Sequence, residues 1–134
     1  MRYLGIDYGE KKLGIAVSDE EGKFAFPFSI ILNKNKENVV KDIQNILKEK
    51  NIKNIVIGES LDLKGLPNKI LEETKIFAKK LKEEKEDINI FFEKEWLSTI
   101  EARRFNDRKD ADDGAAAIIL QRFLDKKEKT IKML

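Results

Sequence analysis

The sequence predicts an α/β protein whose core is a mixed five-stranded sheet flanked by helices. Three short apolar runs separated by tight polar turns open the chain, and this pattern is typical of an antiparallel meander. The apolar residues then change to helical spacing and alternate with two further short apolar runs, which indicates parallel strands joined by crossover helices. A chain of 134 residues can bury a core of its own, so we expect one domain over residues 1–134.

The meander is predicted from the runs Arg2–Asp7, Leu13–Ser18 and Phe24–Leu32. Gly9 and the charged residues after it suit the tight turn of a hairpin between the first two strands. Pro27 cannot donate a backbone hydrogen bond. We therefore expect the third strand to lie at an edge of the sheet or to contain a bulge.

The next four elements are predicted to alternate between helix and strand. Apolar residues recur at helical spacing within Lys36–Lys50 and again between Ile70 and Leu81, which predicts two amphipathic helices. The β-branched run Ile52–Ile57 ends at a glycine and is typical of a buried parallel strand. The run Ile88–Phe92 predicts the fifth strand.

The C-terminal third of the chain is predicted to be helical. Ser98 and Glu101 form a capping box, which favours a short helix that starts there. The run Ala115–Leu124 predicts a last helix that opens near Asp110–Asp113, because Asp is favoured at a helix N-terminus. Residues Lys126–Leu134 are expected to form a frayed basic tail. The resulting order, βββαβαβαα, is the layout of the ribonuclease H-like fold.

The composition excludes several kinds of chemistry. The chain has no Cys and no His, so thiolate nucleophiles, Cys-based zinc sites and imidazole bases are impossible. Carboxylates without Cys or His favour the hard cations Mg²⁺ or Mn²⁺. No signal peptide or long apolar run is present, so we expect a cytoplasmic protein with no membrane partner. The net charge of +2 is too balanced to indicate nucleic-acid binding by itself.

Hydrolysis of a phosphodiester at two divalent ions needs three or four carboxylates that converge from different elements. Asp7 ends the first predicted strand between Gly5 and Gly9, which would let a phosphate or another chain approach closely. The alternative for Asp7 is a residue that caps the following turn. The candidates for the set are Asp7, Glu59, Glu93, Glu95, Asp112 and Asp113.

The later carboxylates also have simpler interpretations. Glu93 and Glu95 follow the fifth predicted strand, where a solvated turn would carry them, and we favour that interpretation for Glu93. Asp112 and Asp113 suit the first turn of a helix, where the dipole favours each by about 0.3–1 kcal/mol. The Ala-rich start of that helix fits close packing against a sheet, which would bring one Asp toward the first strand.

Basic residues flank the proposed site in two groups. Such groups could hold phosphates, although a solvated charged surface is the simpler interpretation in a chain this rich in Lys. The first group lies in the first turn and the second lies between the last two carboxylate positions. They consist of Lys11 and Lys12, and of Arg103, Arg104, Arg108 and Lys109.

Four motifs follow one another along the chain. The first, LGIDYGEKKLGIAVSD, occupies Leu4–Asp19, and VIGES occupies Val56–Ser60. KEWLST at Lys94–Thr99 is followed by Glu101 and Ala102, and DDGAAAIILQ occupies Asp112–Gln121. In order and spacing these motifs resemble, over nearly the whole chain, the YqgF/RuvX family of Holliday junction resolvases, which are also described as pre-16S ribosomal RNA processing nucleases.

The resemblance implies a ribonuclease H-like nuclease and assigns roles to particular residues. Asp7 matches the catalytic Asp of the family's first strand, and Glu95 matches the Glu of its Asp-Glu-Arg motif. Asp112 matches the Asp of the last helix, with Asp113 as a close alternative. The implied Mg²⁺ or Mn²⁺ ligands are therefore Asp7, Glu95 and Asp112, and Glu59 is a possible additional carboxylate.

The chain departs from the family pattern in two motifs. Lys94 stands where the family has Asp, and Trp96 stands where it has Arg. Glu59 and Ser60 replace Leu and Pro after the glycine of the fourth strand. The loss of the Arg would remove a phosphate contact or a supporting salt bridge, which concerns efficiency and substrate preference more than the fold.

The residues leave several functions open. The leading hypothesis is a metal-dependent endonuclease that acts on structured nucleic acid. The family resemblance favours processing of the 5′ end of pre-16S ribosomal RNA, with a pre-ribosomal particle as a possible partner. The alternatives are a Holliday junction resolvase and, because of Lys94 and Trp96, a non-catalytic nucleic-acid-binding module. An actin-like ATPase would need a second such domain. Either structured RNA or branched DNA could be the partner, and the chain could act as a monomer or a homodimer.

Overall fold

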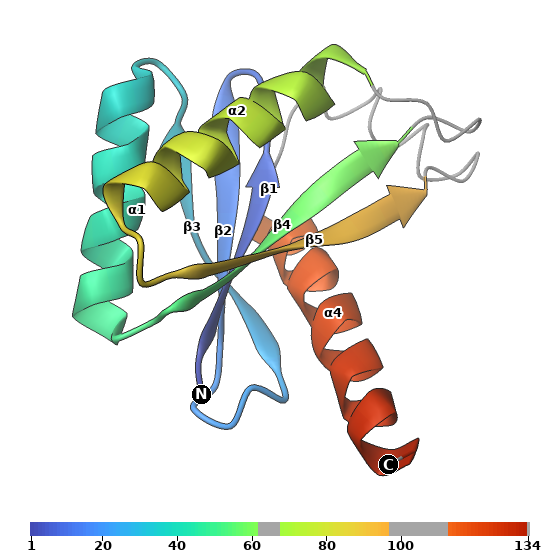
Figure 1. The fold of residues 1–134 in the computed structure, drawn as a ribbon. Helices are drawn as coiled ribbons and strands as arrows, with labels where there is room; N and C mark the ends of the chain where they lie inside the picture. The colour runs from blue at the N-terminus through green and yellow to red at the C-terminus, as the bar shows by residue number, and fades with distance from the viewer. Residues whose placement is uncertain (62–67, 97–112, 134) are drawn as a thin grey trace.

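The computed structural model describes residues 1–61, 68–96 and 113–133 of the chain (Figure 1). One five-stranded sheet lies between helices α1 and α2 on one face and helix α4 on the other. The elements in chain order are β1 (Tyr3–Tyr8), β2 (Lys12–Ser18), β3 (Ala25–Leu32), α1 (Lys36–Lys50), β4 (Asn54–Leu61), α2 (Lys69–Glu84), β5 (Asn89–Trp96) and α4 (Asp113–Met133).

The strand order is β3-β2-β1-β4-β5. The first three strands form the predicted antiparallel meander, and β4 and β5 continue the sheet in parallel with β1. β3 is an edge strand, and the register between β2 and β3 shifts next to Pro27, as a bulge requires. Both expectations for this strand, an edge position and a bulge, are therefore confirmed.

The main hydrophobic core lies between the sheet and the pair α1 and α2. Successive side chains of a strand point to opposite faces, so alternate residues of β1 and β4 enter this core. Leu4, Ile6, Ile55 and Ile57 are all fully buried there. A second, smaller cluster packs under α4 on the other face of the sheet.

The predicted helix over Lys36–Lys50 is confirmed with the same bounds. The Asn35 side chain accepts hydrogen bonds from two main-chain amides of the first turn, as an N-cap does. The helix ends at Asn51, which has a left-handed φ of 54°. The helix predicted to start at Ser98 lies outside the described residues.

Two expectations about the C-terminal half are wrong. The strand predicted to end at Phe92 continues to Trp96, because Gly58 to Leu61 of β4 pair with it residue by residue. The tail predicted to fray from Lys126 is helical as far as Met133. Side chains of its first residues contact the sheet, and cations favour the C-terminal part of a helix.

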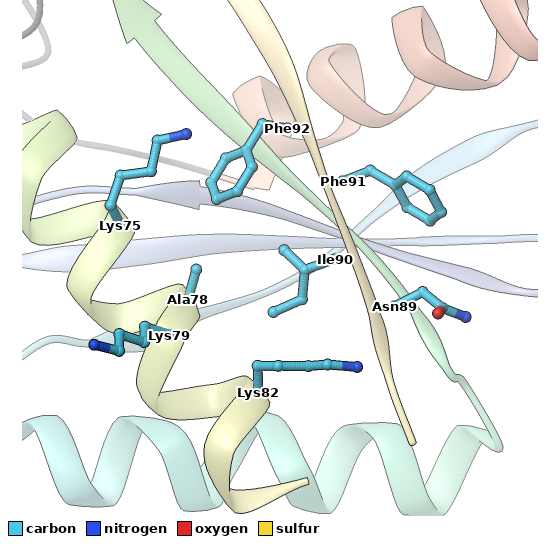
Figure 2. A pocket seen from close by; sticks show the side chains of 8 residues that line it. All are labelled: Lys75, Ala78, Lys79, Lys82, Asn89, Ile90, Phe91 and Phe92. Atoms are coloured by element: carbon cyan, nitrogen blue, oxygen red, sulfur yellow. The ribbon is translucent and has the colours of Figure 1, made fainter. Parts of the chain in front are cut away.

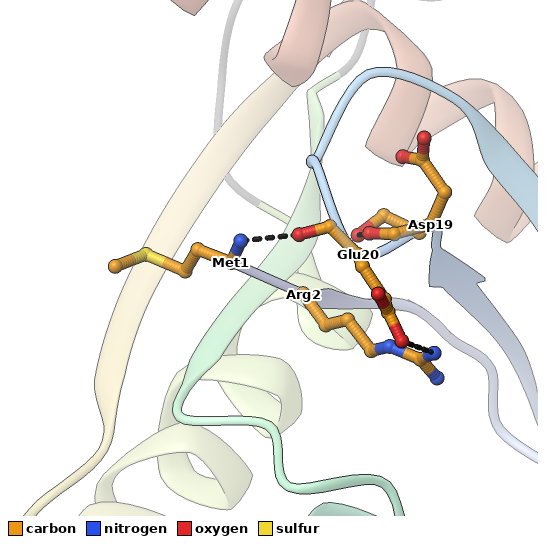
Figure 3. Close-up of polar contacts among 5 residues, drawn as sticks. Met1, Arg2, Asp19 and Glu20 are labelled. Atoms are coloured by element: carbon orange, nitrogen blue, oxygen red, sulfur yellow. Dashed lines mark hydrogen bonds and ion pairs between the residues drawn. The ribbon is translucent and has the colours of Figure 1, made fainter.

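The loop between β2 and β3 is held by polar contacts with the N-terminus (Figure 3). Arg2 forms an ion pair of 3.1 Å with Glu20, and the N-terminal amine of Met1 donates to the carbonyl oxygen of Glu20. Asp19 Oδ1 accepts hydrogen bonds from the main-chain amides of Lys23 and Phe24 at 2.8 and 3.1 Å. These amide hydrogen bonds, from Phe24 above all, lower the pKa of the Asp19 carboxyl.

None of the helices that the structure describes is long and apolar enough to cross a membrane.

Candidate active site

Asp7 lies on β1, the strand at the middle of the sheet, and is buried at 4% exposure. It pairs directly with Gly14 of β2. On the other side, β1 runs parallel to β4 with Ile6 opposite Ile57, so the next position places Asp7 level with Gly58. The only carboxylate of β1 therefore lies between two strands that carry glycine at its level.

Two glycines bring α4 close to the sheet on the face that carries Asp7. A Cβ atom on Gly5 would lie 2.8 Å from Leu120 Cβ and 3.0 Å from the carbonyl oxygen of Ala116. A Cβ atom on Gly58 would lie 2.6 Å from Ile119 Cδ1. The helix therefore packs directly on the backbones of β1 and β4.

Helix α4 runs antiparallel to β1. Its residues 116 and 120 pack on Gly5, whereas Phe123 and Lys127 further along contact Tyr3 at the start of the strand. Its first described residue, Asp113, therefore lies toward the end of β1 that carries Asp7. The expectation that an Ala-rich helix brings an acidic first turn toward the first strand agrees with this packing.

Glu93 is buried at 4% exposure and lies in β5, so the solvated turn that we favoured for it is wrong. Its carboxylate forms an ion pair with Lys126 of α4. Glu93 pairs with Gly58, so Asp7, Gly58 and Glu93 stand at one level across three strands. The main chains at Asp7 and Glu93 are then two strand spacings apart, roughly 10 Å, and both side chains face α4.

Glu95 also belongs to β5 rather than to a turn, and its backbone pairs with Ser60. Its side chain lies outside the described residues, as does the whole of Asp112. The basic residues Arg103, Arg104, Arg108 and Lys109 are outside the described ranges as well. Lys11 lies in the turn between β1 and β2 and is exposed, and Lys12 is the first residue of β2.

Glu59 lies on the opposite face of the sheet. Its carboxylate forms an ion pair of 2.6 Å with Lys75 of α2, and the Lys75 Nζ atom lies 3.6 Å from the centre of the Phe92 ring. The structure therefore does not bring Glu59 to Asp7. Within residues 1–61, 68–96 and 113–133, no three acidic residues cluster closely enough to hold a metal ion.

A groove of about 510 Å³ lies near Lys75, between α2 and β5 (Figure 2). Ala78, Ile90 and Phe92 give it an apolar surface, and lysines of α2 stand along it. Lys82 donates to the main-chain carbonyl oxygens of Glu86 and Ile88, just before β5. The groove lies on the face opposite Asp7, so it is separate from the candidate site.

Solved structures of similar shape define the class of fold. Thermus thermophilus RuvC has a TM-score of 0.53 and 15% identity, over 70% of this chain and 64% of that chain. The fowlpox virus Holliday junction resolvase has a TM-score of 0.50 and 13% identity, over 94% of this chain and 99% of that chain. At these identities the likeness concerns the fold, which is that of the ribonuclease H-like nucleases.

Similar sequences identify the family. A protein of Ehrlichia ruminantium (strain Welgevonden) named "Putative pre-16S rRNA nuclease" is 35% identical over 92% of this chain and 85% of its own length. A protein of the same name from Sulfurihydrogenibium sp. (strain YO3AOP1) is 36% identical over 93% and 90%. The RuvX family model, described as Holliday junction resolvase, matches residues 1–126. The chain belongs to the RuvX family, and it is accordingly a nuclease, a hydrolase of phosphodiester bonds.

The Glu93–Lys126 ion pair was not predicted from the sequence. The signal available was the spacing of Phe91, Glu93 and Glu95, which places these positions on one face of a strand. Phe91 contacts Phe123 with ring centroids 5.1 Å apart, so this face packs on α4. If this run is predicted to be a strand rather than a turn, Glu93 is predicted to be buried and therefore to need a cation as a partner.

Proposed function

We propose that this chain is a divalent-metal-dependent endonuclease that processes the 5′ end of pre-16S ribosomal RNA. The observation that carries the proposal is the burial of Asp7 on the central strand, under the helix whose first turn is acidic. The names of relatives about 35% identical support the choice of RNA. Structured RNA would bind on the sheet face that carries Asp7.

The proposed metal ligands are Asp7, Glu95 and Asp112, with Asp113 as the alternative to Asp112. By the two-residue period of a strand, position 95 shares the sheet face of Glu93, which is the α4 face. Position 112 directly precedes the start of α4, which points toward the Asp7 end of β1. The proposed ligands would thus come from β1, from β5 and from the residue before α4.

The donor chemistry of these residues fits Mg²⁺ or Mn²⁺, because each ligand is a carboxylate and the chain offers no softer donor. When bound, such ions activate water and neutralise charge on the attacked phosphate. The chain's own part is to hold Asp7 in a fixed place on the sheet. Lys11 in the turn after β1 and Lys12 at the start of β2 are proposed to hold the phosphates of the substrate.

The second candidate is a Holliday junction resolvase. A second structure of Thermus thermophilus RuvC, in complex with a Holliday junction substrate, has a TM-score of 0.51 to this chain, and this likeness in fold favours the second candidate. The family description names the same activity. The two candidates share the site and differ in the nucleic acid.

Cleavage of the two substrates side by side separates these candidates. Labelled precursor 16S RNA and a labelled four-way DNA junction are each incubated with the protein and Mn²⁺. We expect cleavage at the 5′ end of the RNA and slower cleavage of the junction. Faster cleavage of the junction would reverse the assignment, and no cleavage of either would overturn the proposal.

The carboxylate variants test the site itself. Asp7→Asn is expected to lower the cleavage rate by on the order of 10³-fold, because it removes a charge that holds the metal. Glu59→Gln is the matched control, since Glu59 is a carboxylate on the other face of the same sheet. It should keep cleavage within about twofold of wild type. Unfolding curves of both variants show whether the fold is intact.

The non-catalytic alternative predicts the opposite result. RNA binding would then survive both Asp7→Asn and chelation of the metal, and neither change would alter any cleavage. Salt-dependent binding that is equal in wild type and Asp7→Asn, with no cleavage by either, would favour that alternative.

A further inference from the structure

The groove between α2 and β5 has lysines on one side and an apolar strand segment on the other (Figure 2). Lys75, Lys79 and Lys82 follow one another along α2 at helical spacing, which places them on one side of the helix. None of the eight described residues that line the groove is acidic. The groove therefore presents a positively charged surface.

The contacts of these lysines leave most of their positive charge without a counter-charge. Among the residues that the structure describes, only Lys75 has a carboxylate partner, which is Glu59. Lys82 donates to two main-chain carbonyl oxygens, which are neutral groups. Lys79 is exposed and forms no ion pair within the described ranges. Since an ammonium group has three donors, the lysines can each bind a further acceptor.

The strand beside the groove has free backbone groups. β5 is an edge strand, and its segment Asn89–Phe92 carries no charge. The amide of Asn89 donates to the carbonyl oxygen of Lys53, just before β4, at 2.8 Å. The backbone groups of successive residues in a strand point alternately to its two sides. The amides and carbonyls of Ile90 and Phe92 therefore point away from β4, toward the edge of the sheet.

The residues with free backbone groups also line the groove. The side chains of Ile90 and Phe92 point from β5 toward α2, whereas those of Asn89 and Phe91 point the other way (Figure 2). Edge strands are normally protected by charges, because their unpaired backbone groups can accept another strand. The charged residues of β5 begin only at Glu93, so the edge beside the groove lacks this protection.

We propose that the groove binds an extended segment of another protein, which pairs with β5 as an added strand and points acidic side chains toward α2. The main chain of this segment bonds to the free amides and carbonyls of Ile90 and Phe92. Every second side chain of an added strand faces α2, where carboxylates meet the lysines. Apolar side chains between them pack beside Phe91, which is 38% exposed on the α4 face. This mode of recognition is β-augmentation.

Nucleic acid is the competing occupant, because lysines also attract phosphates. The free backbone groups favour a peptide, since they include carbonyl oxygens, for which phosphate groups have no donor. The Phe92 ring is not available to stack on a base. Lys75 Nζ lies 3.6 Å from the centre of that ring, and the side chain packs against the main core. The groove lies on the face opposite Asp7, so the inference does not depend on the proposed nuclease function.

Binding of a fluorescein-labelled peptide of alternating Glu and Val to the intact chain tests the proposal without metal or cleavage. We expect saturable binding below about 1 mM, and no binding of a matched peptide of alternating Lys and Val. Lys79→Glu should weaken binding by about tenfold, because it replaces an attraction by a repulsion. Failure of the Glu–Val peptide to bind, or equal binding of the Lys–Val peptide, would overturn the proposal.

Lys41→Glu is the matched control for the charge reversal. Lys41 is an exposed lysine of α1 and does not line the groove. Its reversal should leave the affinity for the peptide within about twofold of wild type, since solvent screens distant exposed charges. Equal weakening by both variants would show that net charge rather than the groove attracts the peptide, and would contradict the proposal.

Amide hydrogen exchange tests the added strand directly. In the free chain, the amides of Ile90 and Phe92 should exchange faster than those of Asn89 and Phe91, which face β4. Saturation with the Glu–Val peptide should slow exchange at Ile90 and Phe92 by about tenfold or more. Unchanged exchange at both amides in the bound state would contradict the pairing.

Ile90→Pro removes the free amide without breaking a hydrogen bond to β4, as proline requires at an edge. Ile90→Ala is its control, because it shortens the same side chain and keeps the amide. Ile90→Pro should bind the peptide about fivefold more weakly than Ile90→Ala. Unfolding curves show whether both variants fold, and if Ile90→Pro does not, hydrogen exchange in wild type decides. A single-stranded oligouridylate that displaces the peptide and binds more tightly, with the same dependence on Lys79, would identify nucleic acid as the occupant and overturn the proposal.

Discussion

The two faces of the sheet are built from the same strands and differ in the side chains that those strands present. On the face under α1 and α2, β1 and β4 present large aliphatic side chains, including Ile6 and Ile57. On the face under α4 the same strands present Gly5, Asp7 and Gly58. The period of two along a strand lets one segment build a core on one face and a site on the other.

The difference indicates where stability and function separate. The first face is a continuous apolar core that any well-packed sheet and helix pair would need. The second face combines two close backbone contacts with two buried carboxylates, Asp7 and Glu93. Burial of a carboxylate has a desolvation cost that burial of an aliphatic side chain does not have, so this face carries features that a hydrophobic core alone does not require.

Shortening Ile57 to alanine should give the largest loss of stability. Ile57 is fully buried in the core under α1 and α2, and removal of such a side chain costs about 2–5 kcal/mol. Urea unfolding measures the loss. Cleavage per folded molecule should stay near that of wild type. A fall in cleavage larger than the fraction of unfolded protein explains would contradict the assignment of stability to one face and function to the other.

Adding one methyl group on the other face should affect stability and activity together. Gly5→Ala places a Cβ against Leu120 Cβ and the backbone of Ala116, which cannot move aside without shifting α4. Such overpacking costs about 1–3 kcal/mol. Because α4 would move away from Asp7, cleavage per folded molecule should fall as well.

Gly58→Ala is the matched control for that change. Its new methyl group meets Ile119 Cδ1, the end of a flexible side chain that can adopt another rotamer. The loss of stability should therefore be smaller than for Gly5→Ala, and cleavage should be less affected. Equal effects of the two variants would mean that the backbone of α4 is not what positions the site.

The sequence predicted most of the fold because its local signals agreed. The helix at Lys36–Lys50 was predicted with its observed bounds, since apolar residues recur at helical spacing inside it. The edge position of β3 followed from Pro27. These features depend on residues close in the chain.

The errors lie where a residue depends on a distant partner. Glu93 is buried with Lys126, thirty-three residues later, as its cationic partner, and the sequence around either residue does not indicate this contact. For the same reason the polar end of β5 was mistaken for a turn and the start of the basic tail for a frayed end. The place of Asp7 was predictable from its motif, but its burial depends on the packing of α4.

The Glu93–Lys126 pair offers a smaller test of the α4 face. Lys126→Met should cost about 1–2 kcal/mol, because the buried carboxylate loses its partner while the largely exposed lysine itself loses little. Lys129→Met, at an exposed position on the same helix, should change stability by less than about 0.5 kcal/mol. Chemical unfolding measures both. Equal results would mean that the pair does not hold the helix to β5.

Asp19 provides the smallest expected effect and a contrast with Asp7, because it lies in a loop and main-chain amides hold its carboxylate. Those hydrogen bonds lower its pKa below the ordinary 3.8, so the charged form stabilises the fold. That stabilisation is complete above about pH 3.8 and is lost as the pH falls through the lower, folded-state value.

Asp19→Asn should therefore unfold at a lower urea concentration than wild type at pH 7, and the difference should shrink as the pH falls below 3.8. Asp19→Ala removes the hydrogen-bond acceptor as well as the charge, so it should remain less stable than wild type at every pH. A difference between wild type and Asp19→Asn that is constant from pH 7 down to pH 2 would show that the charge is not what stabilises the loop. Asp7→Asn, in contrast, is expected to act mainly on cleavage.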